Sequence, residues 1–286
     1  MTLLRKSLVW LVLVAPCAGA FAQENGPIKA PFSDPTRPGT VHVGLITGGI
    51  TVIASDTKEV IVDVVGGDPI RQPPPDDARG LRRLTPQPGI TIEEKNNQME
   101  IRAWPPHRTL ELRIQVPRKT QLELSTVNDG DIRVERVEGE LELGNVNGSI
   151  ELTDVGGAVV AHTVNGKVLA TFSRVAPDKA MAFTSLNGAV DVTLPASIKA
   201  NVRLRTDNGS AFTDFDLNVQ PASNPPDVED SRPHGGRYRI EVNKVIYGSV
   251  NGGGPEIEMR TFNGNIYLRK AGGANAAATN ARKPAP

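Results

Sequence analysis

Four acidic side chains beside two glycines are the residues of this chain whose spacing best suits catalysis. They lie in an Asp-Gly-Asp and a Glu-Gly-Glu segment. Carboxylates held together on one face cleave glycosidic bonds in many polysaccharide-degrading enzymes, one as the acid and the other as the base or nucleophile. Acidic residues beside turn glycines are also common as solvated corners, which is the interpretation we favour. The four residues are Asp129, Asp131, Glu138 and Glu140.

Metal ligands and nucleophiles are scarce. Asn128, Asp129 and Asp131 have the donor atoms of a weak calcium site, but the regular aspartate spacing of calcium-binding glycine repeats is absent. No histidine has a partner at metal-ligand spacing, and neither an HExxH nor a GxSxG motif is present. The sequence therefore predicts no catalytic residue, no cofactor and no metal. The histidines are His42, His107, His162 and His234.

Few aromatic rings are available to stack against sugars. Of these, Phe183 and Phe262 fall in predicted core positions, and Trp104 either is exposed or covers one end of the fold. The run Gly252-Gly253-Gly254 is not a phosphate-binding loop, because no helix and no Lys-Ser/Thr pair follows it.

A nine-residue repeat must position these side chains. In each interval between its glycines, apolar residues stand at the second, fourth and seventh positions after the glycine. Alternation at the second and fourth positions is typical of a strand with one buried face, and the shift at the seventh indicates a corner. Two nonapeptides therefore predict one flattened rung of an all-β, single-domain β-solenoid, a parallel β-helix-like stack of short strands. The glycines are Gly130, Gly139, Gly148, Gly157 and Gly166.

The corners have a recurring sequence of their own, in which asparagine precedes glycine. Glycine supplies the positive φ that a sharp corner needs. In a stack the asparagines come into register and hydrogen-bond along its axis, while the preceding apolar residue, such as Val146 or Val164, fills an inward corner. Antiparallel hairpins also use Asn-Gly turns, so a meander of hairpins is the alternative. The asparagines are Asn147, Asn165, Asn187, Asn208 and Asn263, with Asn128 added if Asp129 is an insertion.

The apolar pattern continues beyond the regular repeats. It survives insertions near Ala176-Pro177 and Pro195 and returns before Gly188 and before Gly264. The outward positions of the strands are charged, which keeps a sheet soluble and discourages edge pairing. The later core positions are Met181, Phe183, Leu186, Ile257, Met259 and Phe262, and the charged outward positions include Arg133, Glu135, Glu142 and Glu151.

Three segments resemble a known family. They are Val116-Pro117, LELSTVNDGDIRV from Leu122 to Val134, and YGSVNGGGPEIEMRTFNGNIYLRK from Tyr247 to Lys270. These segments are similar to the bacterial putative-adhesin family of β-strand repeats, and the resemblance covers about Val41 to Lys270. It implies a β-solenoid of the cell envelope or a secreted one, with an adhesive or scaffolding role, and it offers no catalytic residues to transfer. Because a fold does not fix a function, adhesion is an expectation by analogy.

The two ends of the chain predict an exported protein. Residues 1–22 combine a basic start, a short apolar run and the cleavage pattern Ala20-Phe21-Ala22 of a signal peptide, and the run is too short to span a bilayer. Residues 23–40 are predicted to be a Pro-rich linker, 41–270 the repeat domain, and 271–286 a disordered Ala/Pro-rich tail. Cys17, the only cysteine, leaves with the signal, so no disulfide holds the mature fold.

The charge balance argues against a basic interaction surface. Removing Arg5 and Lys6 from 32 basic side chains leaves 30 against 32 acidic ones, a formal charge of −2. Nucleic acid and anionic membranes attract basic faces, so neither is an expected partner. We therefore expect an exported, non-enzymatic cell-envelope protein, periplasmic or secreted, that binds a surface polysaccharide or an envelope protein. A polysaccharide-cleaving enzyme on a β-helix scaffold is the alternative.

Overall fold

The computed structural model describes residues 26–67, 89–104, 109–220, 227–230, 238–241 and 245–272 of the 286-residue chain. Within these ranges the chain is built of strands and contains no helix, so the all-β prediction is confirmed. The predicted signal peptide and nearly all of the predicted tail lie outside the described residues, as do His107 and His234.

Twenty strands form one sheet, which folds into two facing layers, and two further strands form a separate hairpin. In spatial order, layer 1 consists of β5 (Ile90–Lys95), β6 (Gln98–Ala103), β2 (Thr40–Thr47), β8 (Gln121–Asn128), β10 (Glu138–Asn145), the second half of β11 (Ile150–Asn165), β13 (Met181–Asn187), β21 (Glu256–Asn263), β15 (Ala200–Asn208), β20 (Val245–Val250) and β17 (Asn218–Gln220). Layer 2 consists of β1 (Ile28–Pro31), β4 (Glu59–Gly67), β7 (Leu110–Pro117), β3 (Ile50–Ser55), β9 (Ile132–Glu135), the first half of β11, β12 (Val168–Val175), β14 (Val190–Leu194), β22 (Ile266–Lys270) and β16 (Ala211–Thr213). The hairpin is β18 (Asp227–Asp230) with β19 (Tyr238–Glu241).

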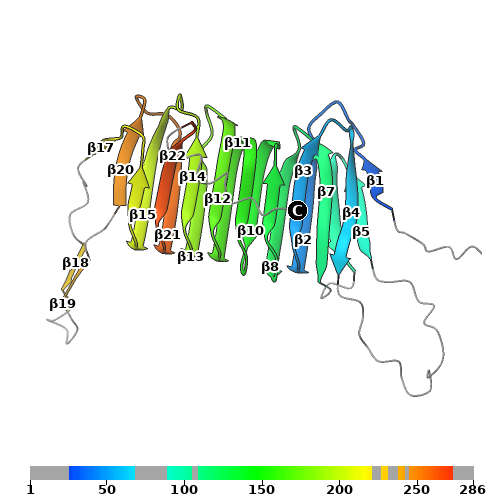
Figure 1. Cartoon of the computed structure of the whole chain (residues 1–286), viewed down its shortest axis with the longest axis horizontal. Coiled ribbons are helices and arrows are strands. Elements are labelled where there is room, and N and C mark those ends of the chain that lie inside the picture. The colour runs from blue at the N-terminus through cyan, green and yellow to red at the C-terminus, as the bar shows by residue number, and fades with distance from the viewer. Residues whose placement is uncertain are drawn as a thin grey trace, which may run out of the picture.

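The strands stand side by side along the long axis of the molecule (Figure 1). Because β11 runs from layer 2 into layer 1, the two layers are parts of one nearly closed sheet. Their inward side chains, mainly valine, leucine and isoleucine, form a single apolar cluster between the layers. Each fully buried side chain of this size contributes about 1.5–3 kcal/mol to folding, so the stack of aliphatic side chains is the main source of stability.

Neighbouring strands in the repeat region pair in parallel, one 18-residue unit apart. Glu138 of β10 lies opposite Gly156 of β11, and Ile150 of β11 lies opposite both Ile132 of β9 and Val168 of β12. Within the described residues, the antiparallel pairs are β1–β4, β4–β7, β5–β6, β15–β20, β17–β20 and β18–β19. All of them lie at the two ends of the stack or in the separate hairpin. The repeat region therefore differs from a meander of hairpins, in which consecutive strands would pair antiparallel.

The spatial order of the strands departs from the chain order at both ends. The first pair, β2 and β3, lies between β6–β7 and β8–β9, and the last pair, β21 and β22, lies between β13–β14 and β15–β16. The expectation that consecutive nonapeptides simply pile up is therefore wrong outside the central repeats. Long-range pairing places β2–β3 and β21–β22 inside the stack and leaves short or antiparallel strands at its ends, where short strands help to protect sheet edges.

The predicted core positions within the strands are confirmed, whereas those at the corners are buried at one type of corner and exposed at the other. The second and fourth positions, for example Leu141 and Leu143, are at most 2% exposed. The seventh position is buried at one type of corner, where Val137 and Val155 are 0% exposed. At the asparagine corners it faces outward. Val146 is 37% exposed, Val164 is partly exposed, and Leu186 and Phe262 are each 46% exposed, so the predicted inward assignment of these four residues is wrong.

Unbroken strand alternation explains this correction. In β8 the side chains of Leu122, Leu124 and Thr126 point inward, so Val127 between Thr126 and the corner points outward. The strand continues to the asparagine, and no corner intervenes to reverse its parity. At the opposite edge of the layers the chain turns earlier, and the valine is carried into the core.

The asparagine corners need glycine because a Cβ atom would clash there, and not because the backbone has a left-handed conformation. The prediction that these glycines supply a positive φ is wrong for Gly130, Gly148 and Gly166. Gly157, at the other type of corner, does have a positive φ of 104°. A Cβ on Gly148 would overlap the carbonyl oxygen of Gly130, and one on Gly166 would overlap that of Gly148. Glycine is therefore needed because the backbones of successive corners touch.

The segment that its prolines predict to be a linker is part of the fold. β1 pairs with β4, and Phe32 is 6% exposed within the apolar cluster. The prolines indicate a loop-like backbone, but the pairing of β1 with β4 holds the segment in the sheet despite this local preference. Residues 28–40 therefore belong to the folded domain.

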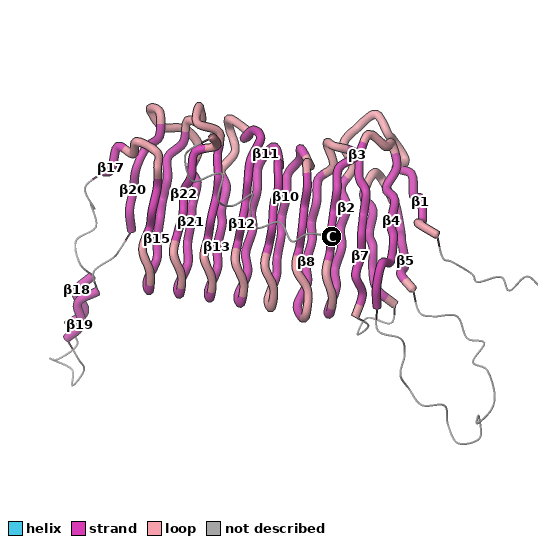
Figure 2. The backbone as a smooth tube through the Cα atoms, in the orientation of Figure 1, coloured by secondary structure: helices cyan, strands magenta, loops and turns pink. Residues whose placement is uncertain are grey.

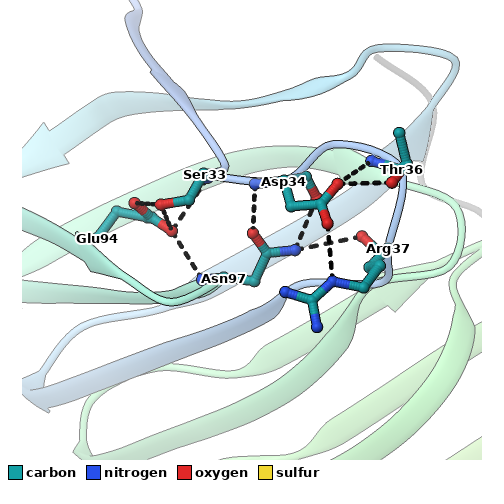
Figure 3. A network of polar contacts seen from close by, with 6 residues as sticks. All are labelled: Ser33, Asp34, Thr36, Arg37, Glu94 and Asn97. Carbon is teal, nitrogen blue, oxygen red and sulfur yellow. Dashed lines mark hydrogen bonds and ion pairs between the residues drawn. The ribbon is translucent and has the colours of Figure 1, made fainter.

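A polar network fixes this segment to the turn between β5 and β6 (Figure 3). The side chain of Asn97 accepts a hydrogen bond from the Asp34 amide (2.6 Å) and donates one to the Asp34 carbonyl (2.7 Å). The Ser33 hydroxyl donates to Glu94 (2.7 Å) and lowers the pKa of that carboxyl group. Hydrogen bonds from Thr36 lower the pKa of Asp34 in the same way. The network holds the segment across one end of the stack.

Candidate functional site

A row of exposed apolar side chains runs along the edge of layer 1 where its strands end. Five members precede the last residue of their strand, Val146 directly follows the last residue of β10, and the register places all six on neighbouring strands. Three of the six are more than 40% exposed, and the others are 38% (Ile46), 37% (Val146) and, for Val164, partly exposed. At about 4.8 Å between strands the row extends roughly 24 Å. We call it the apolar row; it consists of Ile46, Val127, Val146, Val164, Leu186 and Phe262.

An exposure above 40% holds for only three of these residues, Val127 (41%), Leu186 (46%) and Phe262 (46%), and these three carry most of the accessible apolar surface of the row. Isolated exposed apolar residues are ordinary, but aligned ones form a continuous patch. The apolar row is therefore a surface feature that an interaction would explain.

A ladder of asparagine side chains lies next to the apolar row, one residue further along each strand. Each amide donates to the side-chain oxygen of the preceding asparagine: Asn147 to Asn128 (3.0 Å), Asn165 to Asn147 (2.9 Å) and Asn187 to Asn165 (2.9 Å). Asn263 continues to Asn187 (2.7 Å), and Asn208 to Asn263 (2.9 Å). The predicted hydrogen bonding of asparagines along the stack is confirmed. We call this line the asparagine ladder.

A second polar ladder lies inside the same corners and was not predicted. At five of the six apolar-row positions the preceding residue is a buried threonine, serine or asparagine whose side chain donates to the glycine carbonyl of the neighbouring corner; the exception is Leu45, before Ile46. Thr206, before Asp207 on β15, makes the same bond. Thr163 donates to Gly148 and Thr261 to Gly188, each at 2.8 Å. A buried carbonyl left unpaired costs about 1–3 kcal/mol, so these bonds fix the direction of the edge. The sequence carried a signal: the donors are Thr126, Asn145, Thr163, Ser185, Thr206 and Thr261, always two residues before the corner asparagine.

Three of the four acidic candidates named from the sequence, Asp131, Glu138 and Glu140, are engaged in local contacts. Asp131 pairs with Arg133 (2.5 Å) and accepts a hydrogen bond from the Ser149 amide (2.9 Å). Glu138 pairs with Arg174 (2.5 Å), and Glu140 pairs with Lys179. Asp129 has a φ of 53° at its corner. The structure therefore places the two acidic segments at opposite edges of the layers and does not bring them together.

The calcium donors are likewise used within the fold. The side-chain oxygen of Asn128 accepts the hydrogen bond from Asn147 in the asparagine ladder, and both carboxylate oxygens of Asp131 have partners. Within the part of the chain that the structure describes, no three histidine, cysteine, aspartate or glutamate side chains are grouped as metal ligands would be.

A shallow groove on the outer face of layer 1 collects three glutamates. It has a volume of about 230 Å³ and is lined by Glu123, Glu140 and Glu142 together with Lys179 and small apolar residues. Glu123 and Glu142 are direct neighbours on β8 and β10. Sequence reasoning named only Glu140 as a candidate, because Glu123 and Glu142 come together through the pairing of strands 19 residues apart.

His42 and His162 both lie on the outer face of layer 1. The His42 Nδ1 atom is 2.8 Å from a carboxylate oxygen of Glu123, beside the groove. His162 is exposed, as its position in the strand predicted. Trp104 is 65% exposed, so of its two predicted positions, exposed or covering one end of the fold, the exposed one is observed. Of the predicted outward charges, Arg133 and Glu142 are exposed, and Glu135 and Glu151 are partly buried.

An aromatic pair on the outer face of layer 2 was missed. The rings of Phe212 and Tyr267 stack with centroids 5.4 Å apart at an interplanar angle of 14°. The Arg269 guanidinium lies 4.9 Å from the Tyr267 ring centre, and its two hydrogen bonds to Asp191 raise its pKa. Cross-strand pairing of β16 with β22 creates the pair, although Phe212 and Tyr267 are far apart in sequence.

No helix in the described ranges has the length and apolar character needed to cross a bilayer.

The class of protein that this geometry defines is all-β, with parallel strand pairs stacked along one axis. No protein-family model matches the sequence, and no curated protein is similar to it. Two solved structures are similar. A putative cell adhesion protein from Clostridium sporogenes shares 14% identity with a TM-score of 0.43, over 86% of this chain and 100% of that one. A putative adhesin from Bacteroides fragilis shares 9% identity with a TM-score of 0.31, over 86% and 96%. Both proteins are named for adhesion, and at these TM-scores neither likeness bears on the family, ligand or activity of this chain.

Proposed function

We propose that this chain is an exported, non-enzymatic β-solenoid of the cell envelope that adheres to an uncharged surface polysaccharide through the apolar row and the asparagine ladder. The observation that carries the proposal is the apolar row itself. A soluble protein gains nothing in folding from aligned side chains such as Val127, Leu186 and Phe262 that remain exposed. Covering such a patch removes apolar surface from water at roughly 25 cal/mol per Å².

The chemistry of the two rows favours a polymer with a repeating, neutral unit. Both rows are uncharged, and they repeat at the strand spacing along a straight edge. Sugar rings offer apolar C–H faces and hydroxyl groups. The apolar row suits the ring faces, and the amides of the ladder still have one free N–H each to donate to hydroxyls. The stacked backbone holds both rows in place before binding, which lowers the entropic cost of association.

Binding to isolated envelope material tests this proposal. We expect the purified protein to sediment with an insoluble envelope fraction and to remain bound after the fraction has been digested with protease. The triple variant Val127→Ser, Leu186→Ser, Phe262→Ser should bind at least about tenfold more weakly, because losing about 1.4 kcal/mol of apolar contact is a tenfold loss of affinity.

A matched triple variant controls for the general loss of apolar surface. Ile28, Val65 and Val219 are 44%, 57% and 56% exposed and lie away from the apolar row, so their replacement by serine should leave binding unchanged. Retention no greater than that of an unrelated exported protein would contradict adhesion. Retention that disappears on protease digestion would instead point to a protein partner and overturn the choice of polymer.

The glutamate groove supports a second candidate function, cleavage of a glycan. Its specific observation is the neighbouring pair Glu123 and Glu142, which lie opposite each other on parallel strands about 4.8 Å apart, so that their carboxyl groups can come within reach of one bound sugar. Carboxyl groups about 5–5.5 Å apart are the arrangement of retaining glycosidases. In this scheme Glu123, which contacts His42, is the nucleophile, and Glu142, which has no ion pair among the described residues, is the acid.

Release of reducing ends from envelope polysaccharide distinguishes the two functions. If the groove is catalytic, Glu142→Gln should reduce turnover by at least about a hundredfold, the usual contribution of general acid catalysis, while Glu151→Gln on layer 2 leaves it unchanged. Under the adhesive proposal, neither the parent protein nor these variants release reducing ends above the level of a blank.

A further inference from the structure

A cleft of about 540 Å³ opens on the edge opposite the asparagine ladder. It lies where β13, β15 and β21 begin, between the chain segments 173–181, 195–200 and 253–257. Figure 2 shows short turns at regular intervals along one long edge of the stack and loops of uneven size along the other. Volumes of about 300–1,000 Å³ are typical of small-ligand sites.

The two sequence insertions create the cleft. At the regular corners of this edge, Val137 and Val155 fold inward and close the end of the core. In the rungs that follow, the insertions near Ala176-Pro177 and Pro195 replace that tight turn. β21 also enters the stack here, between β13 and β15, without a regular corner of its own. The aliphatic core therefore lies directly beneath the cleft at this point.

The floor and walls of the cleft are apolar. Met181, Ala200 and Ile257, the residues at its base, are each at most 2% exposed and belong to the central apolar cluster. Ile198 and Ala176 pack against the same cluster from the sides. An aliphatic group entering the cleft would continue the stack of the core.

The rim of the cleft is positively charged. Arg174, Lys179 and Lys199 line it, and no acidic side chain does. Arg174 and Lys179 are balanced by ion pairs with Glu138 and Glu140, whereas no carboxylate among the described residues pairs with the Lys199 ammonium group. An anionic group at the mouth of the cleft would therefore find an available cation.

Two asparagines hold the walls in place. The Asn251 side chain donates to the carbonyls of Ala196 (3.0 Å) and Ile198 (2.7 Å), and Asn201 donates to the carbonyl of Gly254 (2.7 Å). Asn251 and the two glycines after it have positive φ values of 48°, 90° and 83°. Glycine adopts such φ values without strain and asparagine tolerates them, so the sequence of this turn suits its conformation.

We propose that this cleft binds an anionic amphiphile, with its alkyl chain against Met181 and Ile257 and its carboxylate or phosphate at Lys199. The site is separate from the apolar row, at the other end of the same strands, so it extends the function beyond polymer adhesion. The same chemistry is offered by a free fatty acid and by the end of an acidic lipid.

Calorimetric titration with decanoate tests the proposal. We expect saturable binding of decanoate to the protein, below the concentration at which decanoate forms micelles, and at least about tenfold weaker binding of decanol and of decyltrimethylammonium. Lys199→Glu should weaken decanoate binding at least about tenfold by reversing the charge at the rim. Ala176→Trp should abolish it by filling the cleft. Lys167→Glu, an exposed lysine on the asparagine edge, is the matched control and should have no effect.

The outcomes separate the proposal from its competitors. Co-sedimentation with vesicles containing phosphatidic acid, lost in Lys199→Glu, would assign the site to a lipid; decanoate binding without co-sedimentation would assign it to a free amphiphile. Equal affinity for decanoate and decanol, unchanged binding in the folded Ala176→Trp variant, or no heat with any of these compounds would overturn the proposal. Because the variants of the apolar row leave the cleft intact, they should bind decanoate normally, whatever the polysaccharide experiment shows.

Discussion

Replacing Val137 by aspartate should unfold the protein, whereas the same replacement at Val146 should leave it folded. Both valines hold the seventh position of the nine-residue repeat and sit one unit apart. Val137 is 0% exposed and closes the end of the core, while Val146 is 37% exposed in the apolar row. A carboxylate at Val137 must be buried without a partner, which costs several kcal/mol out of a total stability of about 5–15 kcal/mol.

Thermal unfolding followed by circular dichroism measures this difference. We expect the Val137→Asp variant to lack a cooperative transition or to melt at least about 10 °C lower, since about 1 kcal/mol shifts the Tm of a domain this size by roughly 2–4 °C. The Val146→Asp variant should melt within about 3 °C of the parent protein, as surface substitutions usually do. Equal loss of Tm in the two variants would show that the two types of corner are not different.

Replacing Gly166 by alanine should be nearly as damaging, although it adds a single methyl group. The new Cβ would overlap the carbonyl group of Gly148 and the amide nitrogen of Ser149, which are backbone atoms of the adjacent corner. To make room, the corners must separate, which disturbs the hydrogen bond from Thr163 to Gly148 and the ladder bond from Asn165 to Asn147. We expect a loss of about 3 kcal/mol, at the upper end of typical overpacking costs.

Gly144→Ala is the matched control for this substitution. Gly144 is also a glycine of layer 1, but a Cβ there would meet only the ring of His162, an exposed side chain that can rotate away. Urea unfolding of the two variants should therefore differ by at least about 2 kcal/mol. A stable Gly166→Ala variant would mean that the corners are further apart than the structure places them, and the explanation of these glycines would be lost.

The two types of corner also show which features residue spacing predicts and which it does not. The alternation of Leu141 and Leu143 sets a strand with one buried face, and the repeat of 18 residues sets which strands pair and aligns the asparagines. These features depend on near neighbours in a regular pattern, so they can be inferred without coordinates. Whether Val146 points inward depends on where the strand ends, which the pattern leaves open by one residue. A shift of one residue reverses the face of a side chain, and the prediction failed there.

The candidate site follows the same division. The asparagine ladder was predictable because its members recur at corners of one kind. The apolar row was assigned to the core, and the donors beneath it, such as Thr163, were overlooked because a buried threonine and an exposed one look alike in sequence. The glutamate groove and the aromatic pair were also missed. Glu142 meets Glu123, and Phe212 meets Tyr267, only through strand pairing.

Residue types and spacing alone predict an all-β chain with stacked asparagine corners, because strand alternation and the chemistry of the turns act over a few residues. The three-dimensional fold was needed to place β2–β3 and β21–β22 inside the stack, to bring residues 28–40 into the domain, and to open the cleft at Lys199. These features depend on pairing between segments about 30 to 80 residues apart, as in Ile28 with Val62, Ile50 with Ile132 and Val190 with Ile266. Such pairing is decided by the packing of the whole core, which no local pattern encodes.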